Sequence, residues 1–108
     1  MSDSLIQEQS SLIGTTWLVY ETKGRFTPFY ITFKANGVAT AITINKIFTG
    51  EFTWSGDYVT VNFTGSFNTQ DKGVFNCIGS PEDKNGHYTY TWSGGKQLGK
   101  FTMIQQPS

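Results

Sequence analysis

The sequence predicts an all-β protein, an eight-stranded antiparallel up-and-down β-barrel with a short N-terminal helix. Aromatic residues make up 16% of the chain and glycine occurs 12 times in 108 residues, a composition that favours strands and tight turns. Segment after segment alternates apolar and polar residues with a period of two, as half-buried strands do. The connections are too short for crossover helices, so neighbouring strands are expected to run antiparallel.

The N-terminal arm and the barrel are expected to form one domain. A chain of 108 residues can bury a core without a disulfide or a metal ion. We assign residues 1–13 to the arm and residues 14–108 to the barrel. Within the arm, residues 3–13 are expected to be helical, because Asp3 or Ser4 can cap a helix whose apolar residues then recur at helical spacing.

Eight strands are expected after the arm. They are Thr16–Glu21, Phe29–Lys34, Val38–Ile44, Ile47–Trp54, Tyr58–Thr64, Gly73–Ile78, His87–Trp92 and Lys100–Gln105. In each strand the alternation places one set of apolar side chains on the inner face. Among the inward residues are Phe29, Ile31, Phe33, Ile42, Ile44, Phe48, Phe52, Trp54, Val59, Val61, Phe63, Phe101 and Met103.

Short turns rich in glycine, asparagine and aspartate connect these strands. Asn36-Gly37 tolerates positive φ and predicts a hairpin. Ser55-Gly56-Asp57 predicts a second turn, and residues 80–86 form a polar loop. Residues 94–99 are rich in glycine but no helix follows them, so they are expected to be a flexible turn rather than a phosphate-binding loop.

The three tryptophans occur in a similar local pattern. Trp17, Trp54 and Trp92 each follow a threonine, and each is followed nine residues on by Phe-Thr. A threefold repeat would indicate a β-trefoil, but the third unit is incomplete and the first departs after its Trp. We favour a geometric interpretation, in which each Trp begins or ends a strand near a barrel mouth. Closure into a barrel removes the exposed edges that eight antiparallel strands would otherwise have.

Four short stretches carry a family resemblance. They are residues 12–17 (LIGTTW), 31–37 (ITFKANG), 50–54 (GEFTW) and 56–61 (GDYVTV). In these stretches the chain resembles the small lipocalin-like, or calycin-like, β-barrels. In that family a Gly and a Trp open the first strand, and the Trp plugs the closed end of the barrel. The resemblance implies that Gly14 and Trp17 form this plug, that residues 3–13 cover it, and that Lys100 is the basic residue over the Trp, although alternation points Lys100 outward.

The distribution of charge argues against a nucleic-acid partner. Eight basic residues balance eight acidic ones, and Arg25 is the only arginine. Affinity for phosphate backbones needs concentrated Lys and Arg, so no nucleic acid is expected. No stretch approaches the ~20 apolar residues of a membrane helix, so no membrane is expected either. The first residues lack the pattern of a signal peptide, which predicts a cytoplasmic protein; a secreted chain whose signal was replaced by Met is the alternative.

No residue pattern predicts catalysis, a metal site or a cofactor. The only histidine, His87, falls on the outward face beside a loop and is expected to be solvated. The only cysteine, Cys77, lies in a short apolar run and is expected to be a buried core residue. Together they cannot supply three protein ligands for a metal ion. Glu51 falls on the outward face of its strand. We therefore expect a non-enzymatic protein without a cofactor.

Inward aromatic residues predict a ligand site at one mouth of the barrel. Most of them are expected to fill the interior. Tyr88, Tyr90 and Trp92 differ, because each carries a polar group that needs a hydrogen-bond partner when buried, which a half-wet pocket would supply. We therefore predict a protein that binds a small, partly apolar or aromatic molecule. The predicted binding residues are Phe33, Phe52, Trp54, Tyr88, Tyr90 and Trp92.

Two other classes of function remain open from the sequence. One is a protein-interaction module, such as a protease inhibitor that inserts residues 1–11 into its partner. The other is a sugar-binding protein that uses exposed Trp and Tyr with Asp57, Asp83 or Asn85 on the loops. The solvent exposure of Trp54 and Trp92 is expected to discriminate among the three classes of function.

Overall fold

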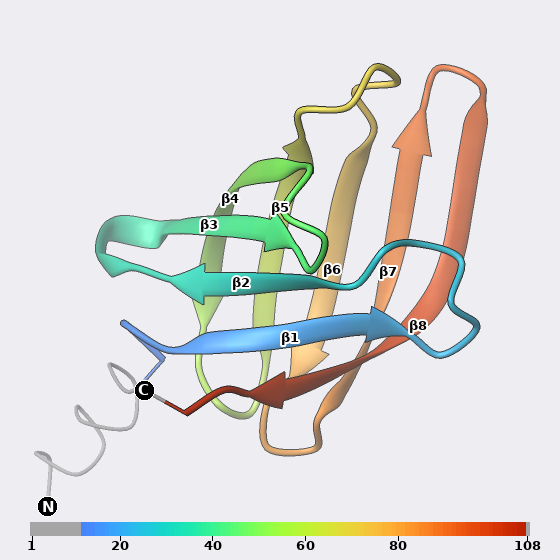
Figure 1. The fold of residues 1–108 in the computed structure, drawn as a ribbon. Coiled ribbons are helices and arrows are strands. Elements are labelled where there is room, and N and C mark those ends of the chain that lie inside the picture. Colours follow the sequence, from blue (N-terminus) through green and yellow to red (C-terminus); the bar gives the residue numbers. More distant parts are fainter. Residues whose placement is uncertain (1–11, 108) are drawn as a thin grey trace, which may run out of the picture.

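The computed structural model describes residues 12–107, which form eight strands (Figure 1). They are β1 (Thr16–Glu21), β2 (Phe29–Phe33), β3 (Val38–Thr43), β4 (Thr49–Gly56), β5 (Val61–Phe67), β6 (Val74–Ser80), β7 (Asn85–Trp92) and β8 (Gly95–Gln105). Each strand pairs antiparallel with the next, and β1 also pairs with β8, so the sheet is a closed barrel. The predicted fold class, an eight-stranded antiparallel up-and-down barrel, is confirmed.

The long strand β8 closes the barrel. Its first part pairs with β7, with Gly95 opposite Trp92, and its last part pairs with β1, with Gln105 opposite Trp17. In Figure 1 this strand accordingly bends from the side of β7 toward β1. The cyclic strand order differs from the three lobes of a β-trefoil, so the trefoil interpretation is wrong.

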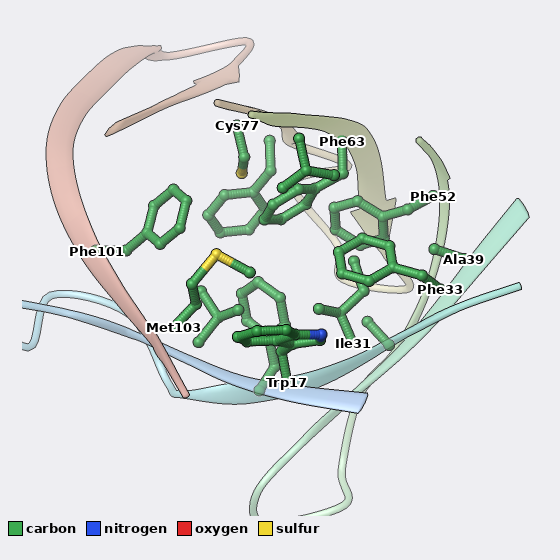
Figure 2. Packing of buried hydrophobic residues seen from close by; sticks show 14 of the residues in the cluster. Trp17, Ile31, Phe33, Ala39, Phe52, Phe63, Cys77, Phe101 and Met103 are labelled. Atoms are coloured by element: carbon green, nitrogen blue, oxygen red, sulfur yellow. The ribbon is translucent and has the colours of Figure 1, made fainter. Parts of the chain in front are cut away.

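Alternating side chains fill the interior of the barrel. In β1, Trp17, Val19 and Glu21 are buried, and the residues between them are partly exposed. Figure 2 shows buried side chains from strands all around the barrel pointing toward a common centre. This apolar burial is the main favourable contribution to folding. The largest fully buried side chains are Phe29, Phe33, Phe63, Phe101, Leu12, Ile31, Met103, Val19 and Val61.

Strand β3 presents the opposite face from the one expected. Ala39, Ala41 and Thr43 point inward, whereas Ile42 is only partly buried and Ile44 is 47% exposed. The register explains the correction, because Ala39 lies opposite both Phe33 of β2 and Phe52 of β4. A small residue between two buried rings leaves room for both, whereas a third large side chain would overfill this layer.

Besides Ile44, two apolar residues predicted to face inward lie outside the strands. Val59 is 60% exposed in the β4–β5 turn, where Asp57 Oδ1 accepts hydrogen bonds from the backbone N–H groups of Val59 and Thr60 at 2.9 and 3.0 Å. Because of this turn, β5 begins at Val61 rather than at Tyr58 as expected. Phe48 is 36% exposed in the connection before β4.

Residues 94–99 are not the flexible turn that their glycines suggested. Strand β8 begins at Gly95, so only residues 93 and 94 connect it to β7. Gly99 lies opposite Tyr88, and a Cβ at this position would approach Glu21 Oε2 to 2.6 Å and the Tyr88 ring to 2.7 Å. The glycine is therefore needed for a close approach of side chains rather than for a turn.

The three tryptophans lie near strand ends, as the geometric interpretation predicts. Trp17 is the second residue of β1, Trp54 lies two residues before the end of β4, and Trp92 is the last residue of β7. Because β1 begins where β4 ends, Trp17 and Trp54 lie at one end of the barrel and Trp92 lies at the other.

The predicted N-terminal helix, residues 3–13, lies almost entirely outside the described residues. Its described end forms a turn, in which the backbone N–H of Thr15 donates to the Leu12 carbonyl at 3.1 Å. Between residues 12 and 107 the helical segment is the short 3₁₀ turn Ala35–Gly37, where Asn36 and Gly37 adopt φ of 66° and 73°. No helix in this part of the chain is long and apolar enough to span a membrane.

We expect Cys77 to react with thiol reagents only after unfolding. Its side chain is 3% exposed, and burial raises the pKa of its thiol. Reaction with a disulfide reagent should therefore be at least about 100-fold slower in the native protein than in denaturant. Equal rates in both conditions, followed by absorbance of the released thiolate, would contradict the burial of this residue.

Candidate binding cavity at the barrel mouth

Four connections gather at one end of the barrel, which we call the mouth. They are residues 22–28, 44–48, 68–73 and 93–94. A cavity of about 340 Å³ opens at this end. Its lining residues are Arg25, Phe26, Thr27, Phe29, Thr43, Phe48, Phe67, Thr69, Asp71, Phe75, Tyr90, Trp92 and Gln97.

Aromatic rings form the floor and much of the wall of the cavity. The most buried of them, Phe29, Phe67 and Phe75, belong to the barrel core and form the floor. The Phe75 ring lies 5.3 Å from the Phe26 ring and 4.6 Å from the Tyr90 ring, measured between centroids. Such contacts hold the rings in fixed positions, so this apolar wall is preformed.

A buried carboxylate, Glu21, organises one side of the mouth. Glu21 is 3% exposed at the end of β1, and its Oε2 accepts a hydrogen bond from Arg25 Nε at 2.7 Å. The Tyr88 hydroxyl donates to the same oxygen at 2.5 Å, and Gln97 Nε2 donates to this hydroxyl at 2.7 Å. The network joins β1, β7 and β8 and positions Arg25 and Gln97 at the cavity wall.

Glu21 is ionised at neutral pH in spite of its burial. Burial opposes ionisation, but the hydrogen bonds from Arg25 and Tyr88 outweigh it and lower the pKa of Glu21 to about 2. Burial and the neighbouring carboxylate raise the pKa of Tyr88. The phenol therefore remains protonated and serves as a hydrogen-bond donor.

Asp71 and Tyr90 form a second polar pair in the cavity. The Tyr90 hydroxyl donates to Asp71 Oδ1 at 2.7 Å, as does the Thr69 hydroxyl, and the backbone N–H of Gly73 donates at 3.1 Å. These bonds, that from Tyr90 first, lower the pKa of Asp71. Burial and Asp71 raise the pKa of Tyr90. Both groups lie in the cavity wall.

Gly73 allows the Tyr90 ring to approach the β5–β6 connection closely. A Cβ at residue 73 would fall 2.1 Å from both the ring carbon Cζ and the hydroxyl oxygen of Tyr90. Any larger residue would displace the ring, because no side chain tolerates so short a contact. The glycine thus leaves the space that the Tyr90 ring occupies beside Asp71.

The structure brings only part of the predicted binding set to the mouth. Tyr90 and Trp92 line the cavity, and Tyr88 lies beside it within the Glu21 network. Phe33 and Phe52 are buried in the core and do not line the cavity.

Trp54 lies at the opposite end, where its indole Nε1–H donates to the carbonyls of Lys34 and Val38 at 2.8 and 3.0 Å. Backbone acceptors thus satisfy the polar group of this tryptophan. Trp54 and Trp92 lie at different ends because their strands run in opposite directions. Strand β4 runs away from the mouth and carries Trp54 near its end, whereas β7 runs toward the mouth and ends at Trp92. Alternation predicts which face a residue occupies, but not its height along the barrel axis.

Several residues in or beside the cavity were not identified from the sequence. Glu21 shares the inward alternation of Trp17 and Val19, and the only arginine follows it four residues later. These two features could have predicted a buried carboxylate paired with Arg25. Phe67 extends the alternation of β5 by two more steps than expected. Asp71 lies in a connection, where no periodicity indicates side-chain direction.

The residues of the predicted plug lie at the end opposite the mouth. Trp17 is 2% exposed, its indole Nε1–H donates to the Thr15 hydroxyl at 2.9 Å, and its ring meets the Tyr58 ring edge-on at 5.9 Å. Gly14 adopts φ of 87°, and its N–H donates to the Phe33 carbonyl at 2.7 Å. Lys100 is exposed and lies opposite His87 rather than over Trp17.

Polar residues considered for other functions lie apart from the mouth. Asp57, Asp83 and Asn85 belong to connections or strand starts at the opposite end, and the predicted arm of residues 1–11 lies outside the described residues. His87 is exposed, as expected. Trp54 and Trp92 are both half-buried rather than flat on the surface.

Comparisons with protein-family models, with curated proteins and with solved structures find no match to this chain. Among residues 12–107, no three His, Cys, Asp or Glu side chains come together in a way that could hold a metal ion.

Proposed function

We propose that the protein is a non-enzymatic binding protein that holds a small, partly apolar or aromatic molecule at the barrel mouth. The cavity of about 340 Å³ carries this proposal. Binding pockets for small molecules are typically 300–1,000 Å³ in volume and combine apolar walls with a few convergent polar groups. Here aromatic rings supply the walls, and Arg25, Asp71 and Gln97 supply polar groups.

The polar groups of the mouth support binding rather than catalysis. A general acid or base works best with a pKa near the operating pH. Glu21 has a pKa lowered to about 2, and the pKa of Asp71 is also lowered, so neither carboxyl is tuned for proton transfer near neutrality. Their hydrogen bonds instead fix Tyr88 and Tyr90 in place. The closed barrel with a cavity at one end also supports a lipocalin-like architecture, which we propose with the function.

Titration with 1-naphthol, followed by NMR, tests the proposal. This molecule has an aromatic body and one hydroxyl, and we expect a dissociation constant on the order of 10–100 μM from its size. The indole N–H resonance of Trp92 and the backbone resonances of Tyr90 and Phe75 should shift, because these residues line the cavity. The indole resonance of Trp54 should not, because this residue lies at the opposite end.

A pair of variants completes this test. Trp92→Ala removes part of the cavity wall and should weaken binding about tenfold. Val59→Ala removes an exposed apolar group at the opposite end and should leave the affinity unchanged. Saturating naphthol that shifts no resonance of the mouth, or shifts the opposite end instead, would overturn the proposed function.

A further inference from the structure

The two charged side chains that line the cavity differ in their partners. Arg25 and Asp71 are the two charged residues that line the cavity. The Arg25 guanidinium is already paired with the buried Glu21 carboxylate, at 2.5 Å between Nη2 and Oε2, and Nη2 also donates to the Leu98 carbonyl at 3.0 Å. This pair is the only salt bridge among residues 12–107. Asp71, the carboxylate that lines the cavity, has no ionic partner among residues 12–107, and Lys23, Lys46 and Lys72 lie exposed in the connections around the mouth.

The two oxygens of Asp71 have different surroundings. Oδ1 accepts all three hydrogen bonds, from the Tyr90 and Thr69 hydroxyls and from the Gly73 N–H. Oδ2 accepts none from the described residues. The carboxylate is thus held in a fixed orientation through one oxygen, and the other oxygen keeps its lone pairs free of protein donors.

Aromatic faces lie next to this carboxylate. The Tyr90 ring is joined to Asp71 through its hydroxyl, and its centroid lies 4.6 Å from that of Phe75 and 5.6 Å from that of Trp92. All three rings line the cavity. A ring face carries partial negative charge and attracts a cation, and Trp attracts it most strongly. Among the lining residues an anion has no comparable partner, because the Arg25 guanidinium is already paired with Glu21 and no lysine lines the cavity.

We propose that the cavity selects small organic cations, that is, molecules with an ammonium group on an apolar body, through Asp71 and the rings of Tyr90 and Trp92. This inference rests on the proposed ligand-binding function and specifies the chemical class of the ligand. The ammonium group lies beside Asp71 Oδ2 and the ring faces, and the apolar body lies over the phenylalanine floor. No bond is made or broken.

Three probes that differ only in one substituent test the selectivity. They are (4-hydroxyphenyl)trimethylammonium, its uncharged isostere 4-tert-butylphenol, and 4-hydroxybenzenesulfonate, measured by calorimetry at a pH where all three phenols are protonated. We expect the cation to bind roughly tenfold more tightly than the neutral isostere, and the sulfonate more weakly than both. Added salt should weaken binding of the cation and leave that of the neutral isostere nearly unchanged.

Asp71→Asn is the decisive variant. Its amide oxygen can keep the three hydrogen bonds to Oδ1 while the negative charge is removed, so the cation and the neutral isostere should then bind within about twofold of each other. Asp83→Asn makes the same change of charge in the β6–β7 turn, at the opposite end, and should retain the tenfold preference. Tyr90→Phe keeps the ring and the carboxylate, and should retain most of the preference.

The outcomes separate this inference from the proposed function. If the neutral isostere binds at the mouth as tightly as the cation, selectivity for cations is wrong and the binding function stands. If none of the probes perturbs the mouth, the binding function itself fails. If Asp71→Asn does not fold, equal salt dependence of the cation and the neutral isostere in the wild-type protein overturns the inference.

Discussion

Replacing Phe29 with alanine is expected to lower the free energy of unfolding by about 3–5 kcal/mol. The side chain is 1% exposed, and its ring lies within 6.1 Å, centroid to centroid, of four other rings, those of Phe26, Phe52, Phe67 and Phe75. Truncation removes the apolar contacts of the ring and leaves a void that the closed barrel cannot collapse to fill. The loss is a large share of the ~5–15 kcal/mol that stabilises a typical domain.

Phe48→Ala provides a matched control for this prediction. Both phenylalanines line the cavity, but Phe48 is 36% exposed in the β3–β4 connection. Its truncation should cost less than about 1 kcal/mol, because exposed positions away from the core tolerate substitution. Chemical denaturation of both variants, monitored by tryptophan fluorescence, measures the difference. Equal losses of stability would contradict the assignment of Phe29 to the core.

The second large effect is acid destabilisation through Glu21. Its pKa is lowered from 4.5 to about 2 in the folded protein, so folding favours the ionised form. The resulting stability is complete above about pH 4.5 and is lost as the pH falls toward about 2. With an allowance for screening at the partly exposed Arg25, we expect the loss to be on the order of 1–3 kcal/mol. Denaturation curves at several pH values in this window measure it.

Glu21→Gln separates this contribution from those of other carboxyl groups. The variant should be less stable than the wild type at neutral pH, because Arg25 loses its ionic partner and Tyr88 loses a charged acceptor. Between about pH 4.5 and 2 its stability should change less than that of the wild type. Asp71, whose pKa is also lowered, contributes in the same direction, but it is exposed whereas Glu21 is buried, so Asp71→Asn should retain most of the dependence on pH. If the stability of Glu21→Gln fell with pH as steeply as that of the wild type, the prediction would be contradicted.

Much of the barrel could be predicted because strand alternation and turn chemistry are local. Asn36-Gly37 formed the expected hairpin turn, and the alternation of Val61 and Phe63 gave the inner face of β5. The prediction of the inward face was wrong for β3, because small residues such as Ala39 and Ala41 are expected on the outer face unless large rings occupy the neighbouring inward positions. That information comes from neighbouring strands, which a single stretch of sequence does not contain.

The site was harder to predict than the fold, because it depends on height along the barrel. Tyr90 and Trp92 were placed on the correct face, but so was Trp54, and only the direction of its strand places it at the other end. Glu21 occupied an inward position that alternation alone could have indicated. Asp71 could not be found in this way, since its position depends on a hydrogen bond to Tyr90 across the β5–β6 connection.

Closure by β8 brings the first and last described segments together, and the backbone N–H of Gln106 donates to the Thr16 carbonyl at 2.8 Å. This junction lies at the end away from the mouth, so a tag or solid support joined to the chain beyond β8 would leave the cavity facing solution. The cyclic strand order also permits a circular permutant, with the old ends linked and new ends cut in the β6–β7 turn. Such a rearranged chain would keep every cavity-lining residue on its original strand or connection.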